Sequence, residues 1–143
     1  MNVLLLNGPN LNLLGEREPE IYGTTTLAQL ESLVSERARE LGIALRTFQS
    51  NHEGALVDRL HEVRRWADGV IFNPGALTHY SYSLRDAIAA TRLRVVEVHL
   101  SELEKREPWR RVSVIADVAA HRIVGKGVGG YLEALEWLAA HAK

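Results

Sequence analysis

Val3-Leu4-Leu5-Leu6, running into Asn7-Gly8-Pro9-Asn10, is the stretch of sequence that decides the fold. An unbroken apolar run of this kind is typical of a strand in a parallel sheet, because helices cover such a sheet on both faces. Asn, Gly and Pro favour turns, so the strand is expected to end before them. The chain therefore begins with a buried strand that leads into a polar turn.

Helical patterns and strand-like runs alternate after this strand. The first helix is expected over residues 27–41, where apolar side chains recur on one helical face. Thr26 and Gln29 form a capping-box pattern at its start, and Gly42 is a suitable residue just past its end. The other expected elements are strands at 43–48, 70–72, 95–98 and 123–124 and helices at 56–67, 84–91 and 131–140.

This alternation predicts an α/β fold in which a five-stranded parallel sheet carries helices on both faces. Right-handed crossovers and the small size favour the flavodoxin-like strand order 2-1-3-4-5. A length of 143 residues suits one domain, and no repeat or linker divides the chain. We therefore expect residues 1–143 to form a single domain.

The composition excludes several classes of protein. A net charge of −1 gives no electrostatic reason to expect a nucleic-acid or membrane partner. The absence of cysteine excludes disulfides, thiolate zinc sites and cysteine nucleophiles. The first residues lack a basic segment, and the apolar run that follows is too short for a signal or membrane segment. A cytoplasmic protein is expected.

Polar residues follow three of the expected strands. Asn7-Gly8-Pro9-Asn10 follows the first, Asn73-Pro74-Gly75 the third and His99-Leu100-Ser101 the fourth. Ligands of open parallel sheets bind at the carboxyl ends of the strands. Each cluster alone suits an ordinary turn, but together they favour a binding site. The segment 8–25 is also longer than the usual connection of roughly 2–6 residues, so it is either functional or disordered.

Glu97 and His99 lie two residues apart on an expected strand, so their side chains point to the same face. A carboxylate that accepts from one imidazole nitrogen fixes the tautomer and raises the basicity of the ring, which suits a general acid or base. A structural ion pair at a strand end explains the same spacing equally well. The spacing leaves both interpretations open.

The long segment contains Arg17 and Tyr22. A tyrosine ordinarily ionises near pH ~10, so a tyrosinate base needs a nearby cation, and arginine stays charged when partly buried. Taken alone, a loop tyrosine and arginine usually serve packing or solvation. His52 and Glu53 indicate the start of a helix, with Asn51 as the expected cap.

No cofactor is expected from the spacing of the polar residues. No pair among the six histidines has a recognised metal-ligand spacing, so we expect no metal site. Gly125-Lys126-Gly127-Val128-Gly129-Gly130 satisfies the pattern G-x-G-x-x-G. Only one helix's worth of chain follows it, which is too little to complete a βαβ unit, so dinucleotide binding is rejected.

Several longer motifs closely resemble those of type II 3-dehydroquinate dehydratases, in the same order and spacing. The motifs are LNGPNLNLLG at 6–15, REP and IYG within 17–23, QSNHEG at 49–54, NPGA and TH within 73–79, RD at 85–86 and EVHLS at 97–101. The resemblance covers essentially the whole chain. It implies one catalytic domain with a flavodoxin-like fold, no cofactor, and a homo-oligomer, typically a dodecamer built from trimers.

The resemblance also implies a lyase reaction, the anti elimination of water from 3-dehydroquinate to give 3-dehydroshikimate in the shikimate pathway. Tyr22, as tyrosinate, removes the proton next to the ketone, and Arg17 supports the tyrosinate and closes the site. A water held near Asn10 stabilises the resulting enolate. His99, oriented by Glu97, protonates the departing hydroxyl.

The substrate-binding groups implied by the resemblance come from several segments. They are the side chains of Asn73, His79 and Arg110, the backbone amides of Leu100 and Ser101, and Asp86 from a neighbouring subunit. Asn73 and the two amides hold the carboxylate, whereas His79 and Arg110 bind the hydroxyls. Arg110 is chosen over the adjacent Arg111.

The alternative is a non-enzymatic flavodoxin-like binding module. A receiver domain needs an acidic pair after the first strand and a phosphorylatable Asp after the third, where this chain has Asn10 and Asn73. A flavin carrier needs a hydroxyl-rich phosphate loop, where this chain has Gly8-Pro9-Asn10-Leu11. An enzyme for another β-hydroxy ketone ring acid also fits the sequence.

The lysines distinguish two routes to the same product. Type I enzymes use a Schiff-base lysine, which must be desolvated enough to be neutral at working pH. The lysines of this chain lie in a charged run, a glycine loop and the C-terminus, at Lys105, Lys126 and Lys143. None of these positions suits an activated amine, which favours the tyrosinate route.

Overall fold

Five parallel strands form the centre of the protein in the computed structural model, which describes residues 1–142. They run in the order β2-β1-β3-β4-β5. Their bounds are β1 Asn2–Asn7, β2 Ala44–Gln49, β3 Gly69–Asn73, β4 Val95–His99 and β5 His121–Val124. The predicted fold class and strand order are therefore confirmed.

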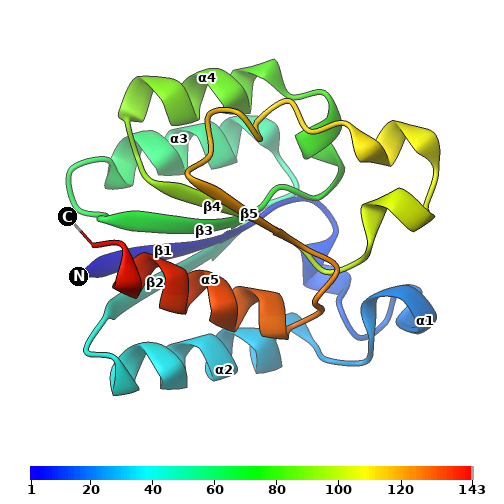
Figure 1. Ribbon diagram of the computed structural model, residues 1–143, viewed down its shortest axis with the longest axis horizontal. Helices are drawn as coiled ribbons and strands as arrows, with labels where there is room; N and C mark the ends of the chain where they lie inside the picture. The colour runs from blue at the N-terminus through cyan, green and yellow to red at the C-terminus, as the bar shows by residue number, and fades with distance from the viewer. Residues whose placement is uncertain (143) are drawn as a thin grey trace.

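Two pairs of helices cover the sheet, α2 (Leu27–Glu40) with α5 (Gly129–Ala140) on one face and α3 (Glu53–Val63) with α4 (Tyr82–Thr91) on the other (Figure 1). Each face has its own apolar cluster. Val3 and Leu5 of β1 belong to the first cluster, and Leu4 and Leu6 belong to the second. Because both faces are covered, the unbroken apolar run of β1 is buried throughout.

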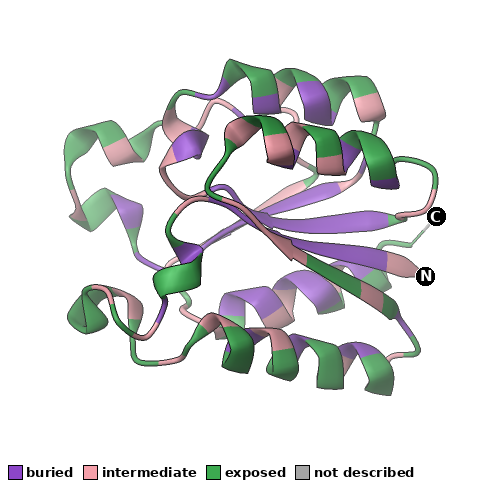
Figure 2. Cartoon of the chain, turned by 180° about the vertical axis from the view of Figure 1, so that it is seen from behind, coloured by how far each residue is buried: buried purple, intermediate pink, exposed green. Residues whose placement is uncertain are grey.

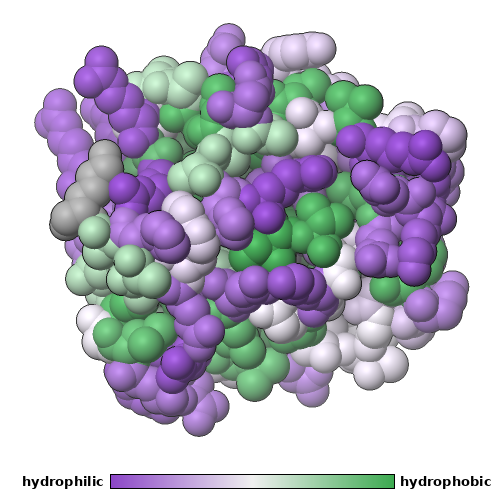
Figure 3. Space-filling model, viewed as in Figure 1, coloured by the Kyte–Doolittle hydropathy of each residue, from purple (hydrophilic) through white to green (hydrophobic). Residues whose placement is uncertain are grey.

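The edges of the sheet are more polar than its centre. Side chains of β2 are exposed along much of the strand (Figure 2). On the side drawn in Figure 3, hydrophilic side chains interrupt the apolar ones around β5. Polar side chains on edge strands discourage pairing with another sheet. Within residues 1–142, no helix is long and apolar enough to cross a membrane.

The capping signals of α2 are formed as predicted. The backbone N–H of Gln29 donates to the Thr26 hydroxyl over 3.2 Å, and the Gln29 side chain accepts from the Thr26 N–H over 3.0 Å. Gly42 follows the helix with a φ of 71°, a conformation that glycine adopts without a steric penalty. These local interactions fix both ends of α2.

The start of α3 differs from the prediction. His52, rather than Asn51, is the N-cap residue, and its side chain makes no capping hydrogen bond. The Asn51 side chain is engaged elsewhere, because its Oδ1 accepts from the backbone N–H of Asn10 over 2.9 Å. The helix also ends at Val63, so Ala67, which is expected in the helix, lies beyond it.

The segment 8–25 is organised by two short helices, η1 (Leu11–Leu13) and α1 (Pro19–Tyr22). Leu11 and Leu14 are buried in the apolar cluster of the α2 and α5 face. Their burial anchors the first half of the segment and directs the second half towards the carboxyl ends of the strands. The remaining short helices are η2 Gly75–His79, η3 Leu103–Lys105 and η4 Pro108–Arg111.

Candidate active site

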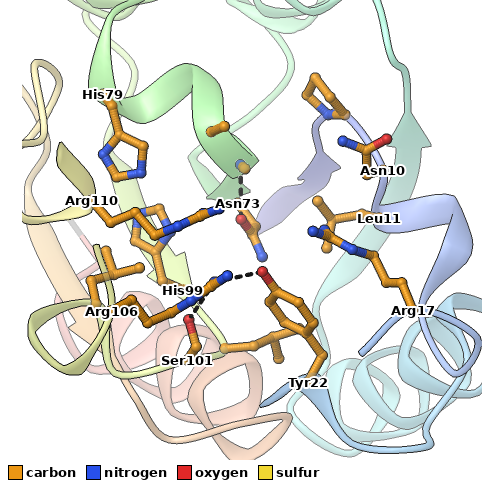
Figure 4. A pocket seen from close by; sticks show the side chains of 15 residues that line it. Asn10, Leu11, Arg17, Tyr22, Asn73, His79, His99, Ser101, Arg106 and Arg110 are labelled. Carbon is orange, nitrogen blue, oxygen red and sulfur yellow. Dashed lines mark hydrogen bonds between the residues drawn. The ribbon is translucent and has the colours of Figure 1, made fainter. Parts of the chain in front are cut away.

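A cavity of about 140 Å³ lies at the carboxyl ends of β1, β3 and β4 (Figure 4). The predicted site residues that line it are Asn10, Arg17, Tyr22, Asn73, His79, His99, Leu100, Ser101 and Arg110. Glu97 lies behind His99, and Asp86 lies outside the cavity. The loops after three neighbouring strands thus meet at one place, as expected for an open parallel sheet.

Glu97 and His99 form a buried pair at the end of β4. Nε2 of His99 lies 2.6 Å from Oε2 of Glu97, whose side chain is fully buried. Thr78 and Ser113 donate their hydroxyls to the same carboxylate over 2.5 and 3.0 Å. A carboxylate only accepts, so Nε2 of His99 donates its hydrogen and Nδ1 is the nitrogen available to the cavity.

Glu97 is held as an anion by its surroundings. Burial raises the pKa of Glu97, but the hydrogen bonds from His99 and Thr78, together with the charge of Arg122, hold this pKa below its ordinary value. A fixed negative charge beside an imidazole favours its protonated form. The pair can therefore orient the ring and support a proton on it.

Two guanidinium groups flank Tyr22, which lies on α1. Nη1 of Arg106 donates to the Tyr22 hydroxyl over 2.6 Å and lies 3.4 Å from the Ser101 hydroxyl. The guanidinium of Arg17 lies over the Tyr22 ring, 4.4 Å from its centroid. Nearby positive charges stabilise a phenolate relative to the neutral phenol. The site thus has the cationic surroundings that a tyrosinate base requires.

Asn73 is held by a buried network at the end of β3. Its Oδ1 accepts from the backbone N–H of Gly75 over 3.0 Å, and its Nδ2 donates to the Tyr131 hydroxyl over 2.8 Å. Tyr131 in turn donates to Oδ1 of Asn7 over 2.7 Å, and burial raises the pKa of Tyr131, so it remains a donor. An amide nitrogen carries two hydrogens, which leaves one for a ligand in the cavity.

Asn10 is positioned by contacts between loops. It adopts the left-handed conformation with φ 70°, which asparagine tolerates better than most residues. Gln49 donates its side-chain amide to the carbonyl of Gly8 over 3.1 Å. A side chain at Gly8 is excluded, because its Cβ would lie 2.6 Å from the carbonyl oxygen of Pro74. The loops after β1 and β3 are therefore in direct backbone contact.

His79 and Arg110 line the opposite side of the cavity. Nδ1 of His79 lies 2.6 Å from the carbonyl oxygen of Val112, and the ring packs edge-on against Trp109. Burial lowers the pKa of His79, and the positive charge of Arg110 acts in the same direction. Nδ1 therefore donates to the carbonyl, and the neutral ring offers Nε2 as an acceptor. Arg111 does not line the cavity, and its guanidinium donates to the carbonyl of Glu104 over 3.3 Å.

The architecture and this cavity agree with what comparison with known proteins shows. A model of the family described as dehydroquinase class II matches residues 1–139 of the chain. The chain belongs to this family. The sequence-based identification as a type II 3-dehydroquinate dehydratase is thereby confirmed.

Individual members of the dehydroquinase family are similar over nearly the whole chain. The 3-dehydroquinate dehydratase of Anoxybacillus flavithermus is 60% identical over 128 residues, which are 90% of this chain and 86% of that protein. A catabolic 3-dehydroquinase of Neosartorya fischeri is 51% identical over 142 residues, covering 99% and 95%. The crystal structure of type II dehydroquinase from Butyrivibrio crossotus superposes with a TM-score of 0.95 at 43% identity, covering 96% and 97%.

The structure adds residues to the site of this dehydroquinase that the sequence did not indicate. Arg106 lies within the charged run that contains Lys105, and Ser113 follows a segment without a strand or helix pattern. Tyr131 and Arg122 come from the last helix and strand, far from the motifs. Each reaches the site through tertiary packing, so no local pattern identifies it.

Asp86 lies outside the cavity and is exposed on α4, so its action from a neighbouring subunit stays a prediction. Among residues 1–142, no group of three or more His, Cys, Asp or Glu side chains is arranged to hold a metal ion.

Proposed function

We propose that the residues of this cavity dehydrate 3-dehydroquinate to 3-dehydroshikimate by an anti elimination through an enolate. The observation that carries the proposal is the presence of two differently equipped groups at one cavity. The phenol of Tyr22 accepts from the guanidinium of Arg106, whereas the imidazole of His99 is bound to a buried carboxylate. One group is suited to accept a proton and the other to deliver one.

Tyr22 acts as the base. Its phenolate takes the proton from the carbon next to the ketone, and the C–H electron pair moves into an enolate. Arg106 at 2.6 Å and Arg17 over the ring stabilise the phenolate. A water held near Asn10 donates to the enolate oxygen, where negative charge develops in the transition state.

His99 acts as the acid in the second half of the reaction. The enolate electrons re-form the carbonyl while the double bond forms, and the C–O bond of the leaving hydroxyl breaks as His99 delivers its proton. Water therefore leaves instead of hydroxide. The Glu97 carboxylate, whose pKa is held low, accepts from Nε2 of His99 and keeps the imidazole oriented for the transfer.

The remaining cavity groups suit the polar substituents of the substrate. The free hydrogen of the Asn73 amide and the backbone amides of Leu100 and Ser101 bind the carboxylate. His79, held neutral, accepts from one hydroxyl through Nε2, and Arg110 donates to another. Hydrogen-bond donors thus face the carboxylate of the substrate. Its hydroxyls face one acceptor, His79, and one donor, Arg110.

The lysines support a route without an imine. Among residues 1–142, the two lysines are exposed and paired with carboxylates, Lys105 with Glu102 and Lys126 with Glu133, both at 2.8 Å. An amine nucleophile has to be desolvated and neutral, which neither environment provides. We assign the reaction to the shikimate pathway, because its product, 3-dehydroshikimate, is an intermediate of that pathway.

Assembly completes the proposal. Asp86 is exposed beside Tyr82, and large side chains next to His79 at the cavity are also exposed, Trp109 at 51% and Val112 at 57%. Covering this surface with a second copy removes apolar area from water and brings the Asp86 carboxylate of that copy to the site. We propose a homo-oligomer built from trimers, typically a dodecamer, in which residues 1–143 form one catalytic domain.

Absorbance at the enone band of 3-dehydroshikimate tests the proposed function. We expect wild type to convert 3-dehydroquinate, borohydride to leave the rate unchanged, and Tyr22→Phe to abolish it. The exposed Tyr80 supplies the matched control, because Tyr80→Phe removes a hydroxyl outside the cavity and should retain activity. Borohydride inactivation or full activity of Tyr22→Phe contradicts the mechanism.

A second pair of variants isolates the contact between Arg106 and the base. Arg106→Met removes the cation hydrogen-bonded to Tyr22, so the acid limb of the rate profile should move to higher pH and turnover at pH 7 should fall about tenfold or more. Arg111→Met removes a neighbouring arginine outside the cavity and should keep the wild-type profile. Equal profiles for the two variants contradict the role of Arg106.

A further inference from the structure

Arg122 lies behind the candidate acid, on the side away from the cavity. It belongs to the edge strand β5 and is the register partner of Glu97 on β4. Its Nε lies 3.3 Å from Oε1 of Glu97, and its side chain is 32% exposed. A positive charge from the surface thus reaches the fully buried carboxylate that holds His99.

The contact between Arg122 and Glu97 is an ion pair without a hydrogen bond. Nε and Nη2 of Arg122 are both buried, yet neither has a hydrogen-bond partner. The Glu97 oxygens are already occupied by His99, Thr78 and Ser113. Arg122 therefore contributes mainly its charge, and its removal leaves the hydrogen bonds of Glu97 intact.

We propose that Arg122 is a positioning residue for the dehydration, which lowers the proton affinity of His99 by offsetting the charge of Glu97. The inference rests on the proposed role of His99 as the acid. Two effects have the same sign. Arg122 weakens the negative potential that Glu97 exerts on the imidazole, and its own positive charge disfavours a second cation close by.

The other charged groups around His99 act from the cavity side. The charged or titratable ones are Arg17 before α1, Tyr22 on α1, His79 on η2, Arg106 after η3 and Arg110 on η4. These groups meet the substrate or its immediate surroundings, so their electrostatic effect changes when a ligand binds. Arg122 does not line the cavity, and its effect on Glu97 persists in the free and the occupied enzyme.

The chemical consequence concerns proton delivery. A lower proton affinity makes the imidazolium a stronger acid towards the departing hydroxyl, at the cost of keeping it protonated over a narrower pH range. The charge of Glu97 alone has the opposite effect. Arg122 therefore moderates a pair that would otherwise hold its proton too firmly.

Rate profiles of Arg122→Met and Arg122→Lys test the proposal. In the proposed mechanism the alkaline limb of the kcat profile reports loss of the proton from His99. We expect this limb to move to higher pH by about one unit in Arg122→Met, to stay near wild type in Arg122→Lys, and KM to change less than about twofold. The Lys variant separates loss of charge from loss of packing.

Arg59 provides a matched control. Its side chain is also 32% exposed and lies 3.3 Å from a carboxylate, Glu62, but both residues are on α3 and neither lines the cavity. Arg59→Met should keep the wild-type profile. If the alkaline limb of the kcat profile lies at the same pH in Arg122→Met and Arg59→Met, the role of Arg122 is only structural and the inference is wrong.

A titration without substrate keeps this inference separate from the proposed function. The imidazole of His99, followed by NMR in histidine-labelled protein and assigned by its loss in His99→Gln, should titrate about one unit higher in Arg122→Met. Unchanged midpoints overturn the inference even if the enzyme is active. Absence of turnover in wild type counts against the proposed function, while the midpoints still decide what Arg122 does.

Discussion

The Glu97 carboxylate is the residue on which the acid side of the site depends. Four groups from separate segments converge on it: His99 from β4, Thr78 from η2, Ser113 after η4 and Arg122 from β5. An uncompensated buried carboxylate is strongly destabilising, whereas this one has a donor or a cation on each oxygen. The carboxylate is therefore ionised in the folded protein, and its protonation by acid removes the stability that these contacts provide.

The stability that Glu97 contributes to the folded protein should depend on pH. The folded-state pKa of Glu97 is depressed, so the carboxylate contributes stability above its unfolded value of about 4.3, and this contribution is lost as the pH falls through the folded-state pKa. We expect Glu97→Gln to be about 1–3 kcal/mol less stable than wild type at pH 7 and this difference to shrink towards roughly pH 3. Urea unfolding at one protein concentration measures both.

The exposed Glu36 on α2 is the control for this prediction. Glu36→Gln should unfold with the acid dependence of wild type. Parallel stability curves for wild type and Glu97→Gln would show that the carboxylate is not ionised in the folded protein.

Tyr131 carries the second prediction, because its hydroxyl joins Asn7 and Asn73 inside the protein. Tyr131→Phe removes the partner of two buried amide atoms, Nδ2 of Asn73 and Oδ1 of Asn7, which should cost about 1–3 kcal/mol of unfolding free energy. It also leaves the Asn73 amide held only by its contact with the backbone of Gly75, so KM should rise more than kcat falls. The exposed Tyr80→Phe should leave both properties unchanged, and equal behaviour of the two variants argues against the network.

The loops that follow the strands position the site at the scale of elements. The loop after β1 passes so close to the loop after β3 that only glycine fits at position 8. The same loop continues into η1, which is anchored by buried Leu11 and Leu14. Arg17 and Tyr22 therefore reach the cavity from a segment that is fixed at its base.

Substitution of Gly8 tests this close approach. Gly8→Ala places a methyl group 2.6 Å from the carbonyl oxygen of Pro74, so the two loops must separate. We expect a loss of about 1–3 kcal/mol in stability and a larger loss of activity, because Asn10 and Asn73 move apart. Gly54→Ala on α3 meets nothing within 4 Å and should be neutral or slightly stabilising. Thermal unfolding and turnover of both variants decide the matter.

The sequence predicts elements best where a local pattern carries the information. The strand β1 and the helix α2 follow from apolar periodicity and a capping box, and both are confirmed. The short helices η1 and α1 are not predicted, because burial of Leu11 and Leu14 stabilises the segment and its own periodicity does not. Asn51 is wrongly expected to cap α3, since its side chain binds a loop that is distant in the sequence.

The same distinction applies to the site. The pairing of Glu97 with His99 follows from their spacing on a strand, and the structure places them 2.6 Å apart. Arg106 and Arg122 come from separate parts of the chain, and only the folded arrangement brings them to Tyr22 and Glu97. Spacing identifies groups that share an element, whereas neighbouring elements supply the charges that tune them.

The proposed role of Asp86 concerns the whole oligomer, because its carboxylate would act at the site of a neighbouring chain. If Asp86 acts across an interface, each site needs residues from two chains. Mixed oligomers of Tyr22→Phe and Asp86→Asn subunits then contain sites with Tyr22 from one chain and Asp86 from the other. Two inactive variants should regain about a quarter of wild-type activity when refolded together in equal amounts.

Light scattering on the same samples tests the proposed dodecamer directly. Mixing the two variants after separate assembly is the control, and it should give little activity until subunits exchange. Failure of the co-refolded mixture to exceed its components, with oligomers present, shows that Asp86 does not complete a neighbour's site.

The interior strand β1 also limits how this chain can change over evolutionary time. Its side chains alternate between two separate apolar clusters, Val3 and Leu5 on one face and Leu4 and Leu6 on the other. Inserting or deleting one residue there exchanges the two sets and turns Asn7 away from Tyr131. Descendants can therefore replace residues of β1 one at a time, but changes in length must accumulate elsewhere, in the turns at the opposite end of the sheet.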